Sequence, residues 1–173
     1  MTKLLLLLSY VSFALAHPHT FIDIYPKLTI ADGYVSKINF KWQMDEMTSG
    51  MLIMEFDQNA NGKIDKSELK YIKDNYFLPL QDYDFYTHIK KIDKSKYKVV
   101  DFDCKILNGR ILYIFGLELS QKIKLENLEM KFYDEDFFVA MMLKKKFVKQ
   151  KIKYKIDELD NDYFFGYEIK YGK

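Results

Sequence analysis

One stretch of twelve residues, 57–68, carries the side chains best suited to binding an ion. Oxygen-bearing side chains recur along it, and these are Asp57, Asn59, Asn61, Asp65 and Glu68. Gly62 stands where such a loop must turn sharply, and Lys63 would contribute its backbone carbonyl oxygen. Ca²⁺ is a hard ion that takes about six to eight oxygen ligands. The stretch therefore predicts a calcium-binding loop.

The spacing matches the twelve-residue EF-hand loop at each of its ligand positions, with the apolar Ile64 in the eighth. The alternative interpretation is an Asx- and Gly-rich surface turn between two helices. Formal negative charge comes only from Asp57, Asp65 and Glu68. We therefore expect weak binding, in about the sub-millimolar to millimolar range of extracellular calcium modules.

A second set of potential ligands lies near the N-terminus, in the run His17-Pro18-His19. If His17 were the first residue, its α-amine and imidazole would chelate Cu, Ni, Co or Zn together. His19 would share the same side of an extended chain, and Asp23 has the same parity. His88 would either complete the site or be a buried histidine with its own partners. The alternative is a pair of solvated terminal histidines.

The pattern of residues 1–16 indicates how His17 could become the first residue of the mature protein. Lys3 precedes an apolar run that ends in Ala14-Leu15-Ala16, a pattern typical of a cleavable secretory signal peptide. The run is short for a transmembrane helix, although an uncleaved anchor is the alternative. We expect residues 17–173 to form a single periplasmic domain that is not itself transmembrane after cleavage.

Composition narrows the classes of function. The formal net charge is +2, so no strong field attracts the protein to nucleic acid. Cys104 is the only cysteine in the sequence, so the chain cannot form an internal disulfide. It alternates with charged residues on a strand-like segment, which predicts a buried and unreactive thiol.

Hydrophobic periodicity predicts an α+β fold, an antiparallel β-sandwich with an inserted EF-hand helix-loop-helix at about 45–80. Asp45 is the expected N-cap of the first helix, 45–56, and Pro79 follows the second, 66–76. Asp-Gly at 32–33 and Asn-Gly at 108–109 are hairpin signals. Strands are predicted over 20–30, 37–44, 86–92, 97–107, 110–119, 128–134, 137–143, 148–156 and 163–171.

Two further side-chain patterns have a functional and a structural interpretation. Met44, Met47, Met51 and Met54 recur at helical spacing. Soft thioethers suit copper(I), but we favour an apolar stripe packed on the sheet, since Met is a common core filler.

The second pattern is a set of alternating lysines: Lys149, Lys151, Lys153 and Lys155. They would either dock an anionic partner or protect an edge strand, and we favour the edge strand.

Four stretches of the chain together resemble domain-of-unknown-function family 1007. They are the N-terminal run His17-Pro18-His19-Thr20-Phe21-Ile22-Asp23, the run Trp42-Gln43-Met44-Asp45-Glu46, the calcium-type loop and Tyr133-Asp134. The resemblance implies a periplasmic component of an uncharacterised transport system, associated with membrane permeases for nickel, cobalt or zinc.

We therefore expect a periplasmic metal-binding accessory protein of zinc, nickel or cobalt transport, working with an inner-membrane metal permease. No nucleophile–base pair or acid–base dyad is recognisable, so we do not expect an enzyme. One alternative is a calcium-stabilised envelope binding module. Another is a copper-dependent oxidative enzyme that uses an N-terminal histidine brace.

Overall fold

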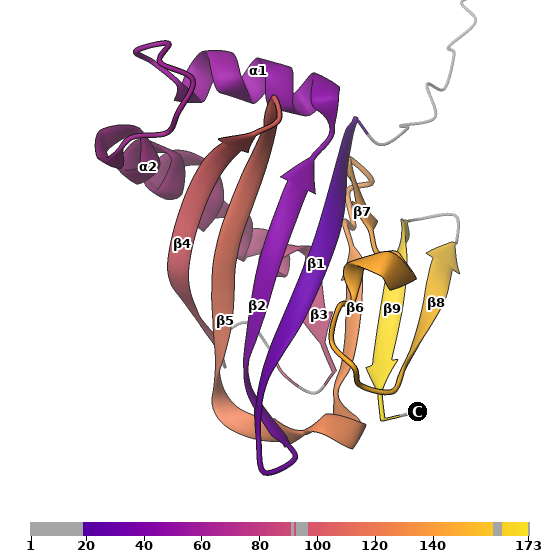
Figure 1. The fold of residues 1–173 in the computed structure, drawn as a ribbon. Helices are drawn as coiled ribbons and strands as arrows, with labels where there is room; N and C mark the ends of the chain where they lie inside the picture. The colour runs from indigo at the N-terminus through magenta and orange to yellow at the C-terminus, as the bar shows by residue number, and fades with distance from the viewer. Residues whose placement is uncertain (1–18, 91, 93–96, 161–163, 173) are drawn as a thin grey trace, which may run out of the picture.

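The computed structural model describes residues 19–90, 92, 97–160 and 164–172. Strands in two sheets make up most of the fold, and few helices accompany them (Figure 1). The strands are β1 (Thr20–Ala31), β2 (Tyr34–Met44), β3 (Thr87–Ile89), β4 (Tyr97–Leu107), β5 (Arg110–Lys124), β6 (Glu129–Tyr133), β7 (Val139–Met142), β8 (Tyr154–Asp160) and β9 (Phe165–Tyr171). The first sheet has the order β4-β5-β2-β1-β7 and the second β3-β6-β9-β8.

Two tight hairpins organise the first sheet, and both were predicted. Asp32 and Gly33 join β1 to β2 with φ of 52° and 77°, and Asn108 and Gly109 join β4 to β5 with φ of 52° and 72°. Positive φ at both central residues is the geometry of the type I′ turn, which matches the twist of the strands. The long strand β5 lies between β4 and β2, as its apolar faces predicted.

The two sheets share an apolar core. Phe40 of β2 lies 5.3 Å from Phe115 of β5 and 6.0 Å from Phe132 of β6, measured between ring centroids. Cys104 is buried there, as predicted, and burial raises the pKa of its thiol to about 12. The predicted mixture of mostly strands and few helices is also confirmed.

The prediction of a purely antiparallel arrangement is wrong at one edge. β7 pairs with β1 in parallel, from Thr20 opposite Val139 to Asp23 opposite Met142. The cause is the turn before β7, where the Phe138 carbonyl accepts the N–H groups of His19 and Thr20 at 2.9 and 3.2 Å. Both strands therefore start at the same end of the sheet.

The predicted strand over 148–156 is also wrong, because a 3₁₀ turn (Lys145–Phe147) precedes it and β8 begins only at Tyr154. The Gln150 side chain explains the irregular segment. Its amide accepts the Leu28 N–H at 2.5 Å and donates to the Leu28 carbonyl at 2.8 Å, beyond the point where β7 stops pairing with β1. Three of the four alternating lysines therefore do not lie on a strand.

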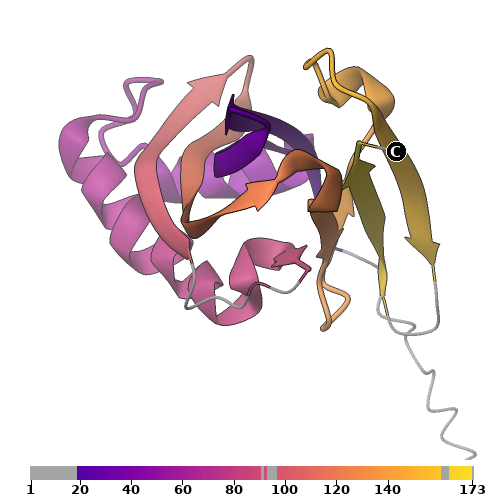
Figure 2. The ribbon, with the colours of Figure 1, turned by 90° about the horizontal axis from the view of Figure 1, so that it is seen from below.

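A short 3₁₀ turn, Leu125–Asn127, follows β5. The longer helical segments lie between β2 and β3 in the chain. They comprise α1 (Glu46–Phe56), α2 (Lys66–Ile72), a π-helical turn (Lys73–Phe77) and a 3₁₀ segment (Leu78–Tyr86). Asp45 caps α1 as predicted, but α2 ends well before Pro79, which instead opens the 3₁₀ segment. Phe77 stacks on Phe102 of β4 at 4.0 Å, and the segment lies along the first sheet (Figure 2).

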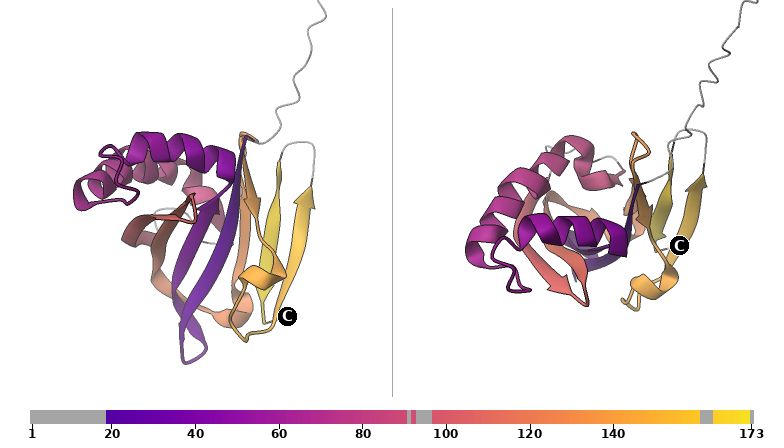
Figure 3. Two further views of the ribbon diagram at one scale, coloured as in Figure 1. Left: turned by 45° about the horizontal axis from the view of Figure 1, so that its top comes forward. Right: turned by 90° about the horizontal axis from the view of Figure 1, so that it is seen from above.

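Helix α1 crosses the end of the first sheet, near the start of β1 (Figure 3). It directs Thr48, Ser49 and Phe56 inward, and the Ser49 hydroxyl accepts the Ile111 N–H of β5 at 3.0 Å. In the part of the chain that the structure describes, neither this helix nor any other is long and apolar enough to cross a membrane.

The predicted packing of the methionine stripe is wrong for three of its four members. Met44 ends β2 and is buried, but Met47, Met51 and Met54 are 65%, 55% and 80% exposed. Helix α1 has apolar residues on both faces, so spacing alone does not determine which face meets the sheet. The hydrogen bonds of Ser49 orient the helix with the methionines outward.

Replacing Gly50 with Ala should stabilise the protein. Gly50 lies inside α1, and a Cβ at this position would meet no atom within 4 Å. Ala favours a helix interior by about 0.8–1.0 kcal/mol over Gly, so a gain of that order is expected in the free energy of unfolding by urea. Gly109→Ala is the control and should destabilise, because φ is +72° there. A loss of stability in Gly50→Ala would contradict the orientation of α1.

Candidate functional site

The predicted calcium loop connects the end of α1 to the start of α2. Asp57 is the C-cap residue of α1, and its two carboxylate oxygens accept the N–H groups of Asn61 at 3.0 Å and Gly62 at 2.8 Å. Gly62 has φ of +77°, the left-handed conformation that the sharp turn requires. The first carboxylate of the loop is thus directed into the loop rather than toward solvent.

The last carboxylate, that of Glu68, closes the loop from the other side. Glu68 is only 4% exposed, and its oxygens accept the N–H groups of Asp65 at 2.9 Å and Asn59 at 3.4 Å. Asp65 in turn caps α2 by accepting the N–H groups of Ser67 and Glu68. The hydrogen bonds that the Asp65 carboxylate accepts from the Glu68 N–H and from Ser67 lower its pKa.

The donor set of this loop suits a hard cation. The Asn59 amide lies 3.0 Å from the Asp65 carboxylate, and the Asn61 amide oxygen accepts the Lys63 N–H at 2.9 Å. Within the described ranges, no three His, Cys, Asp or Glu side chains gather at metal-site spacing. Carboxylates alone therefore do not make the site, and amide and backbone oxygens would have to complete it, as EF-hand loops use them.

The N-terminal histidines are described only in part. His17 lies outside the described residues, as does the predicted signal peptide. His19 is exposed, its N–H donates to the Phe138 carbonyl at 2.9 Å, and its ring centroid lies 5.7 Å from that of Phe138. The backbone at His19 is therefore fixed at the start of β1.

The turn that holds His19 is built around the carboxylate of Asp134. This residue is 3% exposed and accepts the N–H groups of Asp136 at 3.1 Å, Phe138 at 3.0 Å and Val139 at 2.9 Å. A buried carboxylate is stable only when such donors surround it. Sequence reasoning noted Asp134 only within the family resemblance and assigned it no role. An Asp at the end of a strand, followed by Glu-Asp, was the available turn signal.

Asp45 connects the same end of the molecule to α1. Its carboxylate accepts the N–H groups of Phe21 in β1 and Thr48 in α1, each at 2.8 Å. Burial acts to raise the pKa of Asp45, but the bonds from Phe21 and Thr48 outweigh it and lower the pKa. Asp23, the predicted weaker ligand, instead lies 3.8 Å from the Arg110 guanidinium.

His88, on β3, stacks on Tyr133 with ring centroids 4.0 Å apart, and its Nε2 lies 3.4 Å from the Tyr133 carbonyl oxygen. The segment 133–138 therefore touches both described histidines, through the rings of Tyr133 and Phe138. No hydrogen bond or ring contact joins His19 to His88 among the described residues.

An acidic hollow of about 230 Å³ lies beside His88. Its carboxylate-bearing lining residues are Asp82, Asp84, Asp134, Glu135 and Asp136. Burial and the charges of Asp134 and Asp136 raise the pKa of Tyr86, another lining residue, to about 12. The hollow therefore has a negative field that favours cations.

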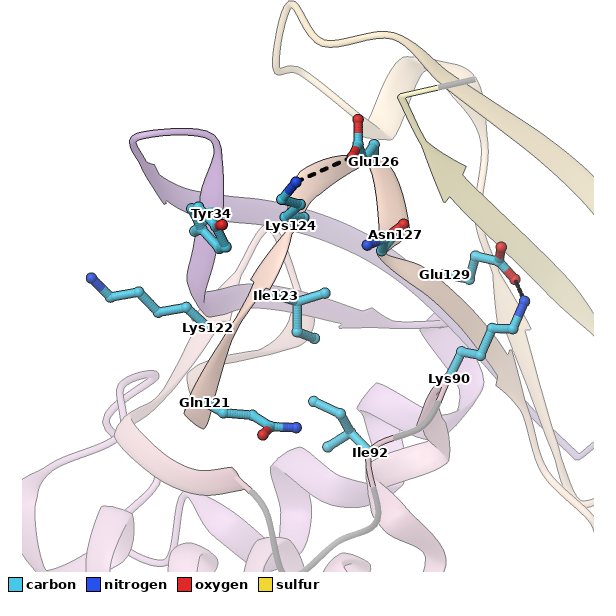
Figure 4. A pocket seen from close by; sticks show the side chains of 10 residues that line it. All are labelled: Tyr34, Lys90, Ile92, Gln121, Lys122, Ile123, Lys124, Glu126, Asn127 and Glu129. Atoms are coloured by element: carbon cyan, nitrogen blue, oxygen red, sulfur yellow. Dashed lines mark hydrogen bonds and ion pairs between the residues drawn. The ribbon is translucent and has the colours of Figure 1, made fainter.

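Another hollow, of about 500 Å³, lies near the tip of the β1–β2 hairpin (Figure 4). Two of its three lysines, Lys90 and Lys124, are paired with Glu129 and Glu126. None of the predicted site residues that the structure describes lines it. This hollow therefore contributes nothing to the predicted metal sites.

Removing the Asp45 carboxylate should destabilise the protein and change its response to acid. Asp45→Ala loses the α1 cap and the bond to Phe21, at a cost of about 1–2 kcal/mol in urea unfolding. Because the folded pKa is depressed, the stabilisation is present above the unfolded pKa and is lost as pH falls through the folded pKa. Asp45→Asn should therefore lose less stability in acid than the parent protein.

Asp74→Ala is the control for this experiment, since it removes only an exposed i,i+4 ion pair with Lys70. We expect it to cost about 0.5 kcal/mol or less. Equal losses for Asp45→Ala and Asp74→Ala would show that the Asp45 bonds do not hold α1 to β1.

Comparison with known proteins agrees with the resemblance of the sequence motifs. An uncharacterized 15.5 kDa protein in the trpE 3′ region of Spirochaeta aurantia is 33% identical over 98 residues, covering 54% of this chain and 69% of that protein. An uncharacterized protein of Haemophilus influenzae is 29% identical over 151 residues, covering 81% of this chain and 69% of that protein. The family described as "Protein of unknown function (DUF1007)" matches residues 2–160, and the chain belongs to this family.

Proposed function

We propose that this protein is a periplasmic metal-binding accessory protein of a transition-metal transport system. It would capture zinc, nickel or cobalt ions through His17 and His19 and pass them to an inner-membrane permease. The observation that carries the proposal is that both described histidines contact the segment 133–138, His19 through Phe138 and His88 through Tyr133. His88 also lines the acidic hollow.

The chemistry of capture follows from the position of His19. Export and cleavage after Ala16 would make the His17 α-amine a ligand, with the His17 and His19 imidazoles beside it. The Phe138 carbonyl accepts the His19 N–H, so the backbone of His19 would lose little further conformational entropy when an ion binds. The carboxylates of the hollow would raise the local concentration of divalent cations.

We also propose that the loop 57–68 is an EF-hand calcium site inserted into a β-sandwich. Asp57, Asn59, Asn61, Asp65 and Glu68 would bind through side-chain oxygens and Lys63 through its backbone carbonyl. The inward carboxylates of Asp57 and Glu68 support this assignment. A bound calcium ion would neutralise them and brace the helices that lie across the end of the first sheet.

Calcium should raise the melting temperature of the parent protein, because an ion that binds only the folded state stabilises it by mass action. At a calcium concentration of about 100 times Kd, the stabilisation is about 2.7 kcal/mol. Glu68→Gln should abolish most of the shift, since it removes charge from the closing ligand. The exposed Glu118→Gln is the control and should keep it. The absence of a calcium-dependent shift in the calcium-free parent would refute the calcium site.

Titration calorimetry with Zn²⁺, Ni²⁺ and Co²⁺ tests the N-terminal site. His19→Ala should weaken binding, and so should one residue added before His17, because the α-amine then becomes an amide. Binding should also weaken in acid, since a protonated imidazole has no lone pair for the metal. Calcium-induced stabilisation should persist in all these proteins, because the two sites use different ligands.

Two comparisons complete this titration. His88→Asn shows whether the second imidazole contributes, since it leaves His17 and His19 intact. Equal affinities for the mature, extended and His19→Ala proteins would overturn the proposed capture site.

A further inference from the structure

The outer face of α1 presents three methionines to solvent. Met47, Met51 and Met54 are 65%, 55% and 80% exposed, and they follow one another at i, i+4 and i+7. Residues three and four apart on a helix are neighbours, with about 5–6 Å between their Cβ atoms. The three thioethers therefore occupy one continuous patch, the methionine patch. They do not pack on the sheet, so core filling does not explain them.

Gly50 lies within this patch, three residues after Met47 and four before Met54. Gly in a helix interior costs about 0.5–1 kcal/mol relative to Ala. A Cβ at Gly50 would meet no atom within 4 Å, and its φ is not in the left-handed region. Neither packing nor backbone conformation therefore requires glycine. Its effect is to leave no side chain between Met47 and Met54 on this face of the helix.

Thioether sulfur is a soft, neutral ligand that selects copper(I) over hard and borderline ions. Methionine is unbranched and has three rotatable bonds, so neighbouring sulfurs can turn toward one ion above Gly50. The adjacent Glu55 carboxylate accepts a hydrogen bond from the Tyr71 hydroxyl of α2 at 2.6 Å. It is therefore directed toward α2, and the thioethers are left as the ligands of the patch.

We propose that Met47, Met51 and Met54 form a copper(I) site on the outer face of α1, with Gly50 providing the space for the ion. The ion binds as copper(I), without change of oxidation state, and the thioether sulfurs displace the weakly held ligands that it carried in solution. This site is separate from the N-terminal histidines and from the loop 57–68. It therefore does not depend on the proposed uptake of zinc, nickel or cobalt.

Silver(I) is a redox-inert soft ion and provides the first test. The full chain, carrying ¹³C-methyl methionine, is titrated with silver(I) and followed by NMR of the methyl groups. Saturable shifts are expected at Met47, Met51 and Met54, and none at the buried Met130 and Met141. Thioethers do not titrate near neutral pH, so the shifts should be the same at about pH 5.5 and pH 7.5, where histidine changes charge. Absence of saturable shifts at the three positions would overturn the proposal.

Copper(I) affinity is then measured anaerobically by competition with a chromophoric chelator. Replacing all three methionines with Leu keeps the patch apolar and helical but removes the sulfurs, so measurable binding should be lost. Met51→Leu alone should weaken binding by about tenfold or more, because Met51 neighbours both other ligands. Gly50→Leu fills the open space and should also weaken it.

Met142→Leu, at a half-buried position on β7, is the matched control and should bind copper(I) like the parent. In His19→Ala the silver(I)-induced methyl shifts at Met47, Met51 and Met54 should persist, which separates this site from the N-terminal one. Circular dichroism confirms that each variant is folded. Unchanged copper(I) affinity in the triple Leu variant would mean that the methionine patch serves only as an apolar surface, and would overturn the proposal.

Discussion

The buried carboxylate of Asp134 is the constraint on which the candidate site depends. Its three backbone N–H partners fold the turn between β6 and β7, and this turn presents the Phe138 carbonyl to the start of β1. The parallel pairing of β7 with β1 begins at that carbonyl. A local side-chain interaction thus decides where an N-terminal strand joins the sheet and where its histidine lies.

Asp45 fixes the position of α1 by hydrogen bonds to backbone groups, as Asp134 fixes the turn between β6 and β7. One carboxylate satisfies a backbone donor of β1 and the first turn of α1 together, while Ser49 joins the same helix to β5. The helix is therefore attached to the end of the first sheet by polar bonds as well as by the apolar contact of Phe56. This attachment leaves the opposite face of the helix free for the methionine patch.

The three segments on which the family resemblance rests, apart from the loop, meet at this end of the molecule. The run after His17 begins β1, the segment after Trp42 ends β2 and caps α1, and Tyr133-Asp134 opens the turn beside both described histidines. They are far apart in the chain but joined by hydrogen bonds to backbone groups. The residues that carry the family resemblance therefore also hold the strands and α1 together at this end of the molecule.

Local chemistry in the sequence was enough to predict the hairpins at Asp32-Gly33 and Asn108-Gly109, the buried Cys104, the cap at Asp45 and the inward side-chain oxygens of the loop 57–68. Each depends on residues close together in the chain, where steric limits on φ and side-chain hydrogen bonds determine the outcome. Three features were decided only by the tertiary structure. β7 joins β1 in parallel, the segment around Gln150 is irregular where a strand was predicted, and α1 directs Met47, Met51 and Met54 outward. Those outcomes depend on partners more than 60 residues away, such as Ser49 with Ile111 and Leu28 with Gln150. The hydrophobic periodicity of a sequence cannot specify such partners, because it shows which face of a helix or strand is apolar but not which residues pack against that face.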